Sequence, residues 1–193
     1  MSPRDHAAIK ALVHGVLLHC DRYEWTRQGL GMLRTYLTRE IRLHVWDCRL
    51  RTPGVSTRHS HPWHFDSHIV VGEVENVRFV ERTDKLGIPT NAQRLACGIG
   101  GGLVGEPAVV NLVELEHEHH REGQTYRQLA DEIHESRPAD GTVTIVTREF
   151  LEDDVHATVY WPIGDEWVTA EPSTAAGAEA IEICHHALRR HWP

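Results

Sequence analysis

The sequence has little of several features that would assign it to a class directly. Of its 20 Lys and Arg residues only Lys10 and Lys85 are lysine, the formal net charge is −8, and no block of five like charges occurs. Broad binding to nucleic acid or to an anionic membrane surface needs a basic stripe, so we expect neither partner. No apolar run approaches the roughly 20 residues that cross a bilayer, and we therefore expect no membrane span.

Cysteine is also scarce. Cys20, Cys48, Cys97 and Cys184 lie far apart and form no C-x-x-C pair, which argues against a disulfide framework and predicts reduced thiols. The apolar stretch near the N-terminus is interrupted by His14 and no small-residue cleavage site follows it. It therefore predicts an amphipathic helix rather than a signal peptide, and the chain is expected to be cytoplasmic.

Histidine, in contrast, is abundant. The chain has 193 residues, which suits a single domain spanning 1–193, and 16 of them are histidine. Most of the histidines fall into three groups: His59, His61, His64 and His68; His117, His119 and His120; and His185, His186 and His191. Imidazole is the commonest metal ligand in proteins, so the question is which group carries chemistry.

The apolar periodicity predicts helices at the two ends of the chain and strands between them. Residues 5–20 and 24–38 have helical spacing, although Gly29 and Gly31 weaken the second segment. Residues 173–190 predict a C-terminal helix with Ser173 or Thr174 as its cap. Strands are expected near 41–45, 65–71, 74–80, 108–115, 129–134, 142–148 and 156–161, with a loop over 83–106.

This succession of elements indicates a fold class. Short strands clustered together and separated by Gly and Pro turns favour an all-β barrel or sandwich over a β-α-β sheet. We therefore expect a mainly β protein: a barrel or sandwich, preceded by two helices within 1–38 and followed by a helix over 173–190.

One spacing suggests a metal site. Gly54 is followed after four residues by His59-x-His61, and a hydrophobic strand then runs to Gly72, which permits a sharp reversal. Residues i and i+2 on a strand face the same way, so His59 and His61 can bind one ion. His134, before a turn and the strand TVTIVTR, is the expected third ligand.

These motifs resemble the two cupin motifs. The segment from Tyr126 through His134 to Arg148 looks like the second motif region of the cysteine dioxygenase-like branch. The resemblance covers residues 40–162 and implies a cupin (double-stranded β-helix, jelly-roll-like) barrel, two preceding helices and an iron site of three histidines. It also implies dimerisation through edge strands, so a homodimer is expected.

The chain departs from the family pattern in two places. Cupins commonly carry a glutamate ligand after the histidine pair, and Phe65 and Asp66 are the candidate positions here. Alternation puts these two residues on opposite faces of the strand. We favour three histidines, with Asp66 as a fourth ligand if it faces inward instead.

The second departure concerns the Ser-x-His-x-Tyr relay of thiol dioxygenases. Its positions match Thr144, Val146 and Arg148 here, so the relay His and Tyr are missing. From its register, Arg148 is expected to face inward, where it could pair with a substrate carboxylate or phosphate. Tyr126 is the candidate for a hydroxyl near the metal.

The remaining histidines have plainer interpretations. His117-x-His119 repeats the spacing of the first pair but lacks the preceding turn and glycine, so we interpret it as solvated, with a role for His117, His119 and His120 at the pocket left open. His64 and His68 lie further along the first metal strand, and because His64 is on the opposite face from Phe65, we expect it to face outward or to support a ligand rather than to bind the metal. The GIGGGL run lacks the Lys-Ser/Thr of a phosphate-binding loop.

Three neutral ligands leave positions for substrate and dioxygen, the arrangement of non-haem iron oxygenases. The leading hypothesis is an Fe(II)-dependent dioxygenase acting on a small polar metabolite, such as an amino acid or thiol derivative. Zn, Mn or Ni are the alternative metals. A non-catalytic binding cupin and a cupin isomerase or lyase are the alternative functions, because the fold alone does not choose among them.

Overall fold

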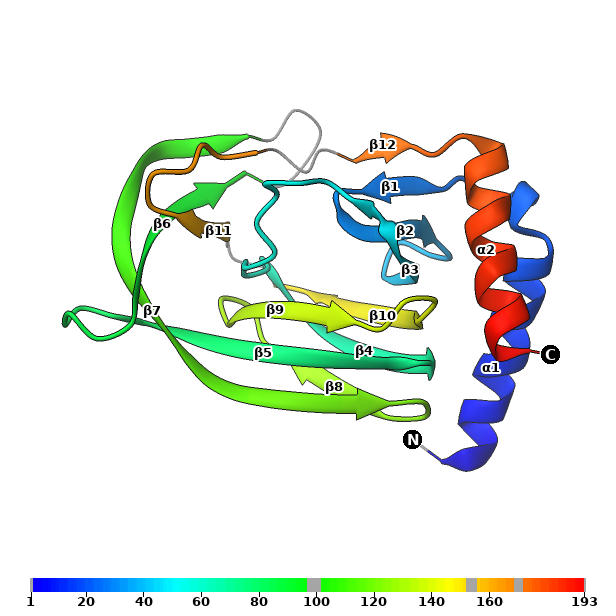
Figure 1. The fold of residues 1–193 in the computed structure, drawn as a ribbon. Helices are drawn as coiled ribbons and strands as arrows, with labels where there is room; N and C mark the ends of the chain where they lie inside the picture. Colours follow the sequence, from blue (N-terminus) through cyan, green and yellow to red (C-terminus); the bar gives the residue numbers. More distant parts are fainter. Residues whose placement is uncertain (1, 97–101, 152–155, 169–171, 193) are drawn as a thin grey trace.

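The computed structural model describes residues 2–96, 102–151, 156–168 and 172–192 (Figure 1). It is mainly β, as expected, and consists of two antiparallel sheets with two α-helices side by side at one end. This arrangement is compatible with a β-barrel or jelly roll. Neither helix is long and apolar enough to cross a membrane.

The larger sheet has seven strands in the order β12-β1-β2-β3-β10-β4-β8, and the smaller has five in the order β11-β6-β7-β5-β9. The strands of the seven-stranded sheet are β1 (Thr26–Gln28), β2 (Leu30–Tyr36), β3 (Ile41–Arg51), β4 (Trp63–Val71), β8 (Thr125–Gln128), β10 (Val143–Phe150) and β12 (Ser173–Thr174). Those of the five-stranded sheet are β5 (Glu73–Arg82), β6 (Ile88–Leu95), β7 (Leu103–Arg121), β9 (Ile133–Pro138) and β11 (Ala157–Pro162).

Both helices cover the outer face of the seven-stranded sheet. Helix α1 (Pro3–Leu18) begins with a capping box between Ser2 and Asp5, and a short 3-10 turn (Cys20–Arg22) follows it. Helix α2 (Gly177–His191) ends with basic residues, which complement the helix dipole.

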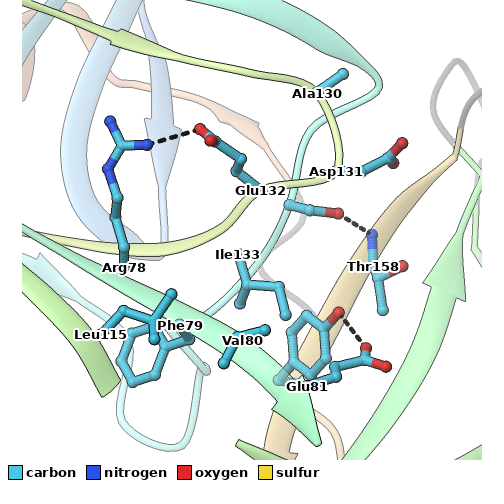
Figure 2. Close-up of a pocket in the computed structure, with 12 residues that line it drawn as sticks. Arg78, Phe79, Val80, Glu81, Leu115, Ala130, Asp131, Glu132, Ile133 and Thr158 are labelled. Atoms are coloured by element: carbon cyan, nitrogen blue, oxygen red, sulfur yellow. Dashed lines mark hydrogen bonds and ion pairs between the residues drawn. The ribbon is translucent and has the colours of Figure 1, made fainter. Parts of the chain in front are cut away.

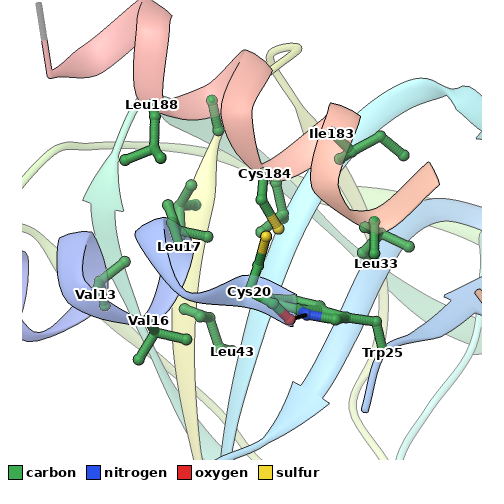
Figure 3. Close-up of a cluster of buried hydrophobic side chains, with 14 of the residues drawn as sticks. Val13, Val16, Leu17, Cys20, Trp25, Leu33, Leu43, Ile183, Cys184 and Leu188 are labelled. Carbon is green, nitrogen blue, oxygen red and sulfur yellow. Dashed lines mark hydrogen bonds between the residues drawn. The ribbon is translucent and has the colours of Figure 1, made fainter. Parts of the chain in front are cut away.

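A large apolar core lies between the helices and this sheet (Figure 3). Leu17 of α1 and Leu43 and Val45 of β3 are completely buried there. Burying a side chain of this size stabilises the fold by roughly 1.5–3 kcal/mol. The other buried members of this core are Val13, Val16, Cys20, Trp25, Leu33, Leu50, Val70, Val71, Val143, Ala180, Ile183, Cys184, Ala187 and Leu188.

The inner face of the same sheet points at the five-stranded sheet. Side chains alternate along a strand, and Leu43 and Val45 of β3 belong to the core under the helices. Their neighbours on β3 therefore face the inter-sheet space; these are Arg42, His44 and Trp46. Phe65 and Tyr126 of the seven-stranded sheet pack there against Val74 of β5. The polar residues of β3 therefore line the interior of the protein rather than its surface.

The helix predicted over 24–38 is wrong. This segment forms β1 and β2, which pair with each other and with β3. Gly31 has φ +98 and lies at a register shift between Leu30 and Met32, so it marks a bulge in a sheet rather than a weak point in a helix. The seven-stranded sheet thus begins well before residue 40.

The prediction of a loop over 83–106 is also wrong for the described residues of this range, 83–96 and 102–106. Strand β6 pairs with both β7 and β11, and β7 runs from Leu103 to Arg121, far beyond the expected strand over 108–115. Local sequence did not reveal β6 because cross-strand pairing stabilises it. Most of the glycine run lies in residues 97–101, outside the described residues.

Smaller corrections concern the ends of other elements. The strand expected near 129–134 is β9 (Ile133–Pro138), and β8 before it was not predicted. The C-terminal helix begins at Gly177, and its N-cap residue Ala176 provides no side-chain cap. Ser173 and Thr174 instead form β12, where Thr174 pairs with Thr26 of β1.

Gly72 makes the reversal between β4 and β5, as its place in the sequence predicts. Its φ is +83, and a Cβ added there would lie 2.4 Å from Thr142 Oγ1 and 2.9 Å from Thr142 Cα. Gly72→Ala should therefore lower the free energy of unfolding by roughly 1–3 kcal/mol, measured by urea denaturation.

Gly15→Ala is the matched control, because Gly15 lies within α1 and has nothing within 4 Å of an added Cβ. This change should raise the free energy of unfolding by up to about 1 kcal/mol. Equal effects of the two substitutions would contradict the strain assigned to Gly72.

Candidate metal centre

The structure brings together the three histidines that the sequence predicts as ligands. One ring nitrogen of each of His59, His61 and His134 lies within 4.8 Å of the others. The ring centroids are 4.6 Å apart for His59 and His61, 4.9 Å for His59 and His134, and 5.2 Å for His61 and His134. This group could bind one metal ion.

Backbone pairing fixes the distance between the two distant segments. His59 lies in the chain before β4, and His134 lies on β9. The His59 N–H donates to the His134 carbonyl at 3.1 Å, and the His134 N–H donates to the His59 carbonyl at 3.0 Å. A second isolated bridge joins His59 to Val159 of β11. The triad is therefore built on sheet hydrogen bonds rather than on a free loop.

Hydrogen bonds at Nδ1 set which nitrogen can bind a metal. His59 Nδ1 lies 2.9 Å from the Thr57 carbonyl oxygen, and His134 Nδ1 lies 2.8 Å from Asn76 Oδ1. Both partners only accept, so each Nδ1 carries the proton and each Nε2 keeps its lone pair. Such a partner behind a histidine ligand fixes both its tautomer and its ring orientation.

The orientation of the Asn76 amide is itself determined. Asn76 is completely buried, and its Nδ2 donates to Glu118 Oε2 and Gln128 Oε1, both at 3.3 Å. Arg78 holds the Glu118 carboxylate through Nε at 3.0 Å. This chain of hydrogen bonds leaves Asn76 Oδ1 as the acceptor that faces His134.

Two ring nitrogens of the triad are close together. His61 Nε2 and His134 Nε2 lie 3.1 Å apart. Two nitrogens bound to one ion at about 2.0–2.1 Å each are separated by roughly 3.0–3.4 Å. The observed separation suits this arrangement, and it also suits a single N–H···N hydrogen bond between the rings.

Burial keeps the imidazoles neutral. It is the main cause that lowers the pKa of His59, and it holds the pKa values of His61 and His134 well below the usual range. Repulsion from His59 lowers the pKa of each of the other two further. Neutral imidazole is the form that binds metals, so no proton need be displaced near pH 7.

Phe65, not Asp66, faces the triad. The Phe65 ring is 5.0 Å from His61 and 5.7 Å from His134. Asp66 lies on the opposite face of β4, where its side chain is 46% exposed and its Oδ2 accepts a hydrogen bond from Arg127 at 3.1 Å. The alternative in which Asp66 is a fourth ligand is wrong, and the site offers three histidines.

Tyr126 lies beside this wall of the site. It is buried, its ring is 6.2 Å from Phe65, and it stacks on His120 at 4.5 Å. Burial raises the pKa of its hydroxyl, which keeps the phenol protonated. Phe65 contacts both Tyr126 and His134, so these contacts give Tyr126 a packing role, and its catalytic role remains a prediction.

Arg148 is on the inner face of β10, as its register predicts. It pairs with Phe65 across β10 and β4, it is 9% exposed, and its guanidinium carbon lies 5.4 Å from the Trp63 ring. The Trp63 ring is in turn 5.1 Å from His61. Arg148 therefore lies one aromatic ring away from the triad.

The other histidines of these segments lie elsewhere. His64 Nδ1 accepts a hydrogen bond from the Ala130 N–H at 2.7 Å, and His68 is buried against His6 of α1, so both lie on the outer face of β4. His117 is exposed between Glu75 and Glu114, and the His119 side chain is 70% exposed. Of that group His120 alone turns inward, through its stack on Tyr126.

A second group of potential ligands fits a metal less well. Ligand atoms of Asp47, Cys48 and Asp140 also lie within 4.8 Å of one another. However, the Asp47 carboxylate accepts hydrogen bonds from the Arg49 guanidinium, and Asp140 Oδ1 accepts one from the Cys48 N–H at 3.0 Å. Its carboxylates are thus already engaged, whereas Nε2 of His59 and His134 is left available.

A hollow along the five-stranded sheet does not contain the triad. It has a volume of about 620 Å³ and lies along β5, β9 and β11, where its lining includes Arg78, Ile133, Thr158 and Tyr160 (Figure 2). Ser60, between His59 and His61, reaches its lining, but none of the three histidines does. Ile133 faces this hollow while the next residue on β9, His134, faces the inter-sheet space.

Comparisons with known proteins add no family assignment. A scan against protein-family models and a search of curated proteins both found no match.

Sequence reasoning missed several residues of the inter-sheet space. Asn76 stands two residues after Val74 in the strand GEVENVRF and so shares its face, and this was the available signal for an interior role. Arg34, Arg42 and His44 alternate with core residues on β2 and β3. The wrong helix over 24–38 concealed Arg34, and the strand expected near 41–45 gave no sign that its polar residues face inward.

If Asn76 orients His134, removing its amide should weaken metal binding. Asn76→Ala is expected to lower metal affinity roughly 10- to 100-fold, measured by competition with a chromophoric zinc chelator. Asn91→Ala is the control, because Asn91 donates only to the Pro162 carbonyl near the surface. Unchanged affinity in folded Asn76→Ala protein would contradict the orienting role.

Proposed function

We propose that this chain is a cupin metalloenzyme, an Fe(II)-dependent dioxygenase that acts on a small polar metabolite in the cytoplasm. The observation that carries the proposal is the convergence of His59, His61 and His134, with the Nδ1 atoms of His59 and His134 held by acceptors. The resemblance of the Gly-x4-His-x-His motif to cupins adds to this support.

The donor set suits iron(II). Three neutral imidazoles contain no thiolate and no carboxylate, so they neither close a structural zinc site nor neutralise the ion. When bound, iron(II) supplies positions at which dioxygen and a substrate can meet. Zn, Mn and Ni also accept imidazole ligands and are the alternative metals.

The chain's own residues would orient the reactants and exclude water. Phe65 and Trp63 form an aromatic wall beside His61, with ring distances of 5.0 and 5.1 Å. Such a wall lowers the local dielectric and strengthens electrostatic contacts to a bound substrate. Arg148 faces the same space and would fix an acidic group of the substrate.

A free thiol is the less favoured substrate. Thr144, Val146 and Arg148 occupy the positions of the thiol dioxygenase relay, and Val146 cannot carry a proton. Thr144 Oγ1 accepts a hydrogen bond from Trp46 Nε1 at 3.3 Å. Another small polar substrate, such as an amino acid or acid derivative, is therefore favoured.

Metal content tests the ligand assignment. The protein reconstituted anaerobically with Fe(II) should bind a single ion per chain, and His59→Ala, His61→Ala and His134→Ala should each lose it. His117→Ala and His119→Ala are controls, because both side chains are outward-facing. Full iron content in folded His59→Ala and His134→Ala variants would rule out the triad.

Dioxygen chemistry has a separate test that needs no known substrate. Nitric oxide is a stable stand-in for dioxygen, and it should bind the Fe(II) protein and produce a new EPR signal if positions on the metal are open. Oxygen consumption with a panel of small acids should then depend on iron. An iron protein that neither binds nitric oxide nor consumes oxygen would instead be the non-catalytic cupin.

A further inference from the structure

Three arginines gather on the inner face of the seven-stranded sheet. Arg34 lies on β2, Arg42 on β3 and Arg148 on β10, which are neighbours in the sheet. Arg34 pairs with His44, and Tyr36 pairs with Arg42, so these side chains share one face. We call Arg34, Arg42, Arg148 and His44 the arginine cluster.

The arginine cluster has buried donors without partners. The Nε atoms of Arg34, Arg42 and Arg148 and Nε2 of His44 are buried and make no hydrogen bond. Among the described residues none of the three arginines forms an ion pair with a carboxylate, although Arg148 donates to the Arg39 carbonyl. Arg78, in contrast, is held by Glu118 and Glu132.

Such an arrangement is costly in the isolated protein. Buried charges are normally paired, and like charges repel strongly where water is scarce. Burial, with repulsion from Arg34 and Arg148, lowers the pKa of Arg42 to about 9. Burial and the same three arginines hold the pKa of His44 well below its usual range.

Aromatic rings support the guanidinium groups but do not neutralise them. The Tyr36 ring lies 5.1 Å from the guanidinium carbons of Arg34 and Arg42, and the Trp63 ring lies 4.9 Å from that of Arg42. Cation–π contacts of this kind contribute about 0.5–2 kcal/mol each. They hold the groups in place and leave the three Nε donors without hydrogen-bond partners.

The arginine cluster adjoins both the triad and the solvent. Trp63 contacts Arg42 on one side and His61 on the other, at 4.9 and 5.1 Å. At the outer rim, Tyr36 is 45% exposed and Phe150 is 42% exposed. The arginine cluster therefore lies between two exposed aromatic side chains and Trp63, the ring that it shares with the triad.

We propose that the substrate of the metal centre is a small dianion, a phosphate monoester or a dicarboxylate, whose charged group binds Arg34, Arg42 and Arg148 while its reactive end faces the triad. The part of this inference that turns the reactive end of the substrate toward the triad rests on the proposed function. Three guanidinium groups without carboxylate partners call for more than one negative charge, because a monocarboxylate would neutralise only one of them.

Calorimetric titration of the metal-stripped protein at constant ionic strength tests the charge of the ligand. The probes are inorganic phosphate, succinate and acetate. Phosphate or succinate should bind at least 10-fold more tightly than acetate, and the stronger of the two identifies the source of the dianion. Equal affinity for acetate, or no binding of either dianion, would overturn the proposal.

Substitutions test the place of binding. Arg34→Gln and Arg42→Gln should each weaken dianion binding roughly 10- to 100-fold. Arg127→Gln is the control, because Arg127 is paired with Asp66 and Glu149 on the outer face. Arg42→Lys keeps the charge but loses the planar guanidinium group, so it should also weaken dianion binding. This variant tests the proposal if Arg42→Gln fails to fold.

The metal content of the same variants separates the two proposals. Arg34→Gln and Arg42→Gln should retain the metal, because neither residue is a ligand. If the triad binds metal but dianion affinity is the same in these variants and in Arg127→Gln, the arginine cluster proposal fails alone. If dianions bind at the arginines but the triad holds no metal, the proposed enzyme fails instead.

Discussion

Imidazole and guanidinium groups lose strong hydration when they are buried, and the space between the two sheets contains both. Proteins bear this cost when each buried donor and acceptor finds a partner. In the triad, the backbone and amide partners of His59 and His134 reach Nδ1 only. The Thr57 carbonyl and the Asn76 amide satisfy the Nδ1 atoms, and Nε2 is left without a proton. The rest of the site depends on this arrangement, in which Nδ1 is hydrogen-bonded and Nε2 is left to bind a metal.

The sheets supply the geometry that makes this possible. Reciprocal backbone hydrogen bonds between His59 and His134 join the chain before β4 to β9. Side chains then alternate between the two faces of β3. Leu43 and Val45 fill the core under the helices, while Arg42 and His44 face the space between the sheets. The helices α1 and α2 stabilise the outer face, and this leaves the inner face free to be polar.

The triad and the arginine cluster lie in the same interior but differ in how far their polar atoms have hydrogen-bond partners. The triad is supported by a hydrogen-bond chain that runs from Arg78 through Glu118 to Asn76. The arginine cluster has aromatic support but no acidic partner among the described residues. Residues that are held in place yet left unsatisfied are typical of binding sites, where stability is given up for function.

The candidate ligands could be predicted because their signals are local. His59 and His61 share a face at spacing i, i+2, Gly72 marks the following reversal, and His134 precedes its own turn. The family pattern gave Phe65 and Asp66 as candidates for the fourth position, and the register of β4 decided between them. These inferences needed no knowledge of distant contacts.

The rest of the interior could not be predicted, because it depends on pairing between segments far apart in the chain. Arg34 was hidden by apolar spacing that suits a helix as well as a strand, until β2 is paired with β3. Asn76 gains its role only when β5 pairs with β9 and brings it to His134. Strand β6 has little apolar pattern and is defined by its neighbours β7 and β11.

The central claim is that three imidazole nitrogens bind the same ion inside the protein. A crystal structure of the Fe(II)-loaded protein, with anomalous scattering recorded at the iron edge, tests this most directly. The account predicts one peak at about 2.0–2.2 Å from a nitrogen of each of His59, His61 and His134. A peak at Asp47 and Asp140 instead, or no peak between the sheets, would contradict it.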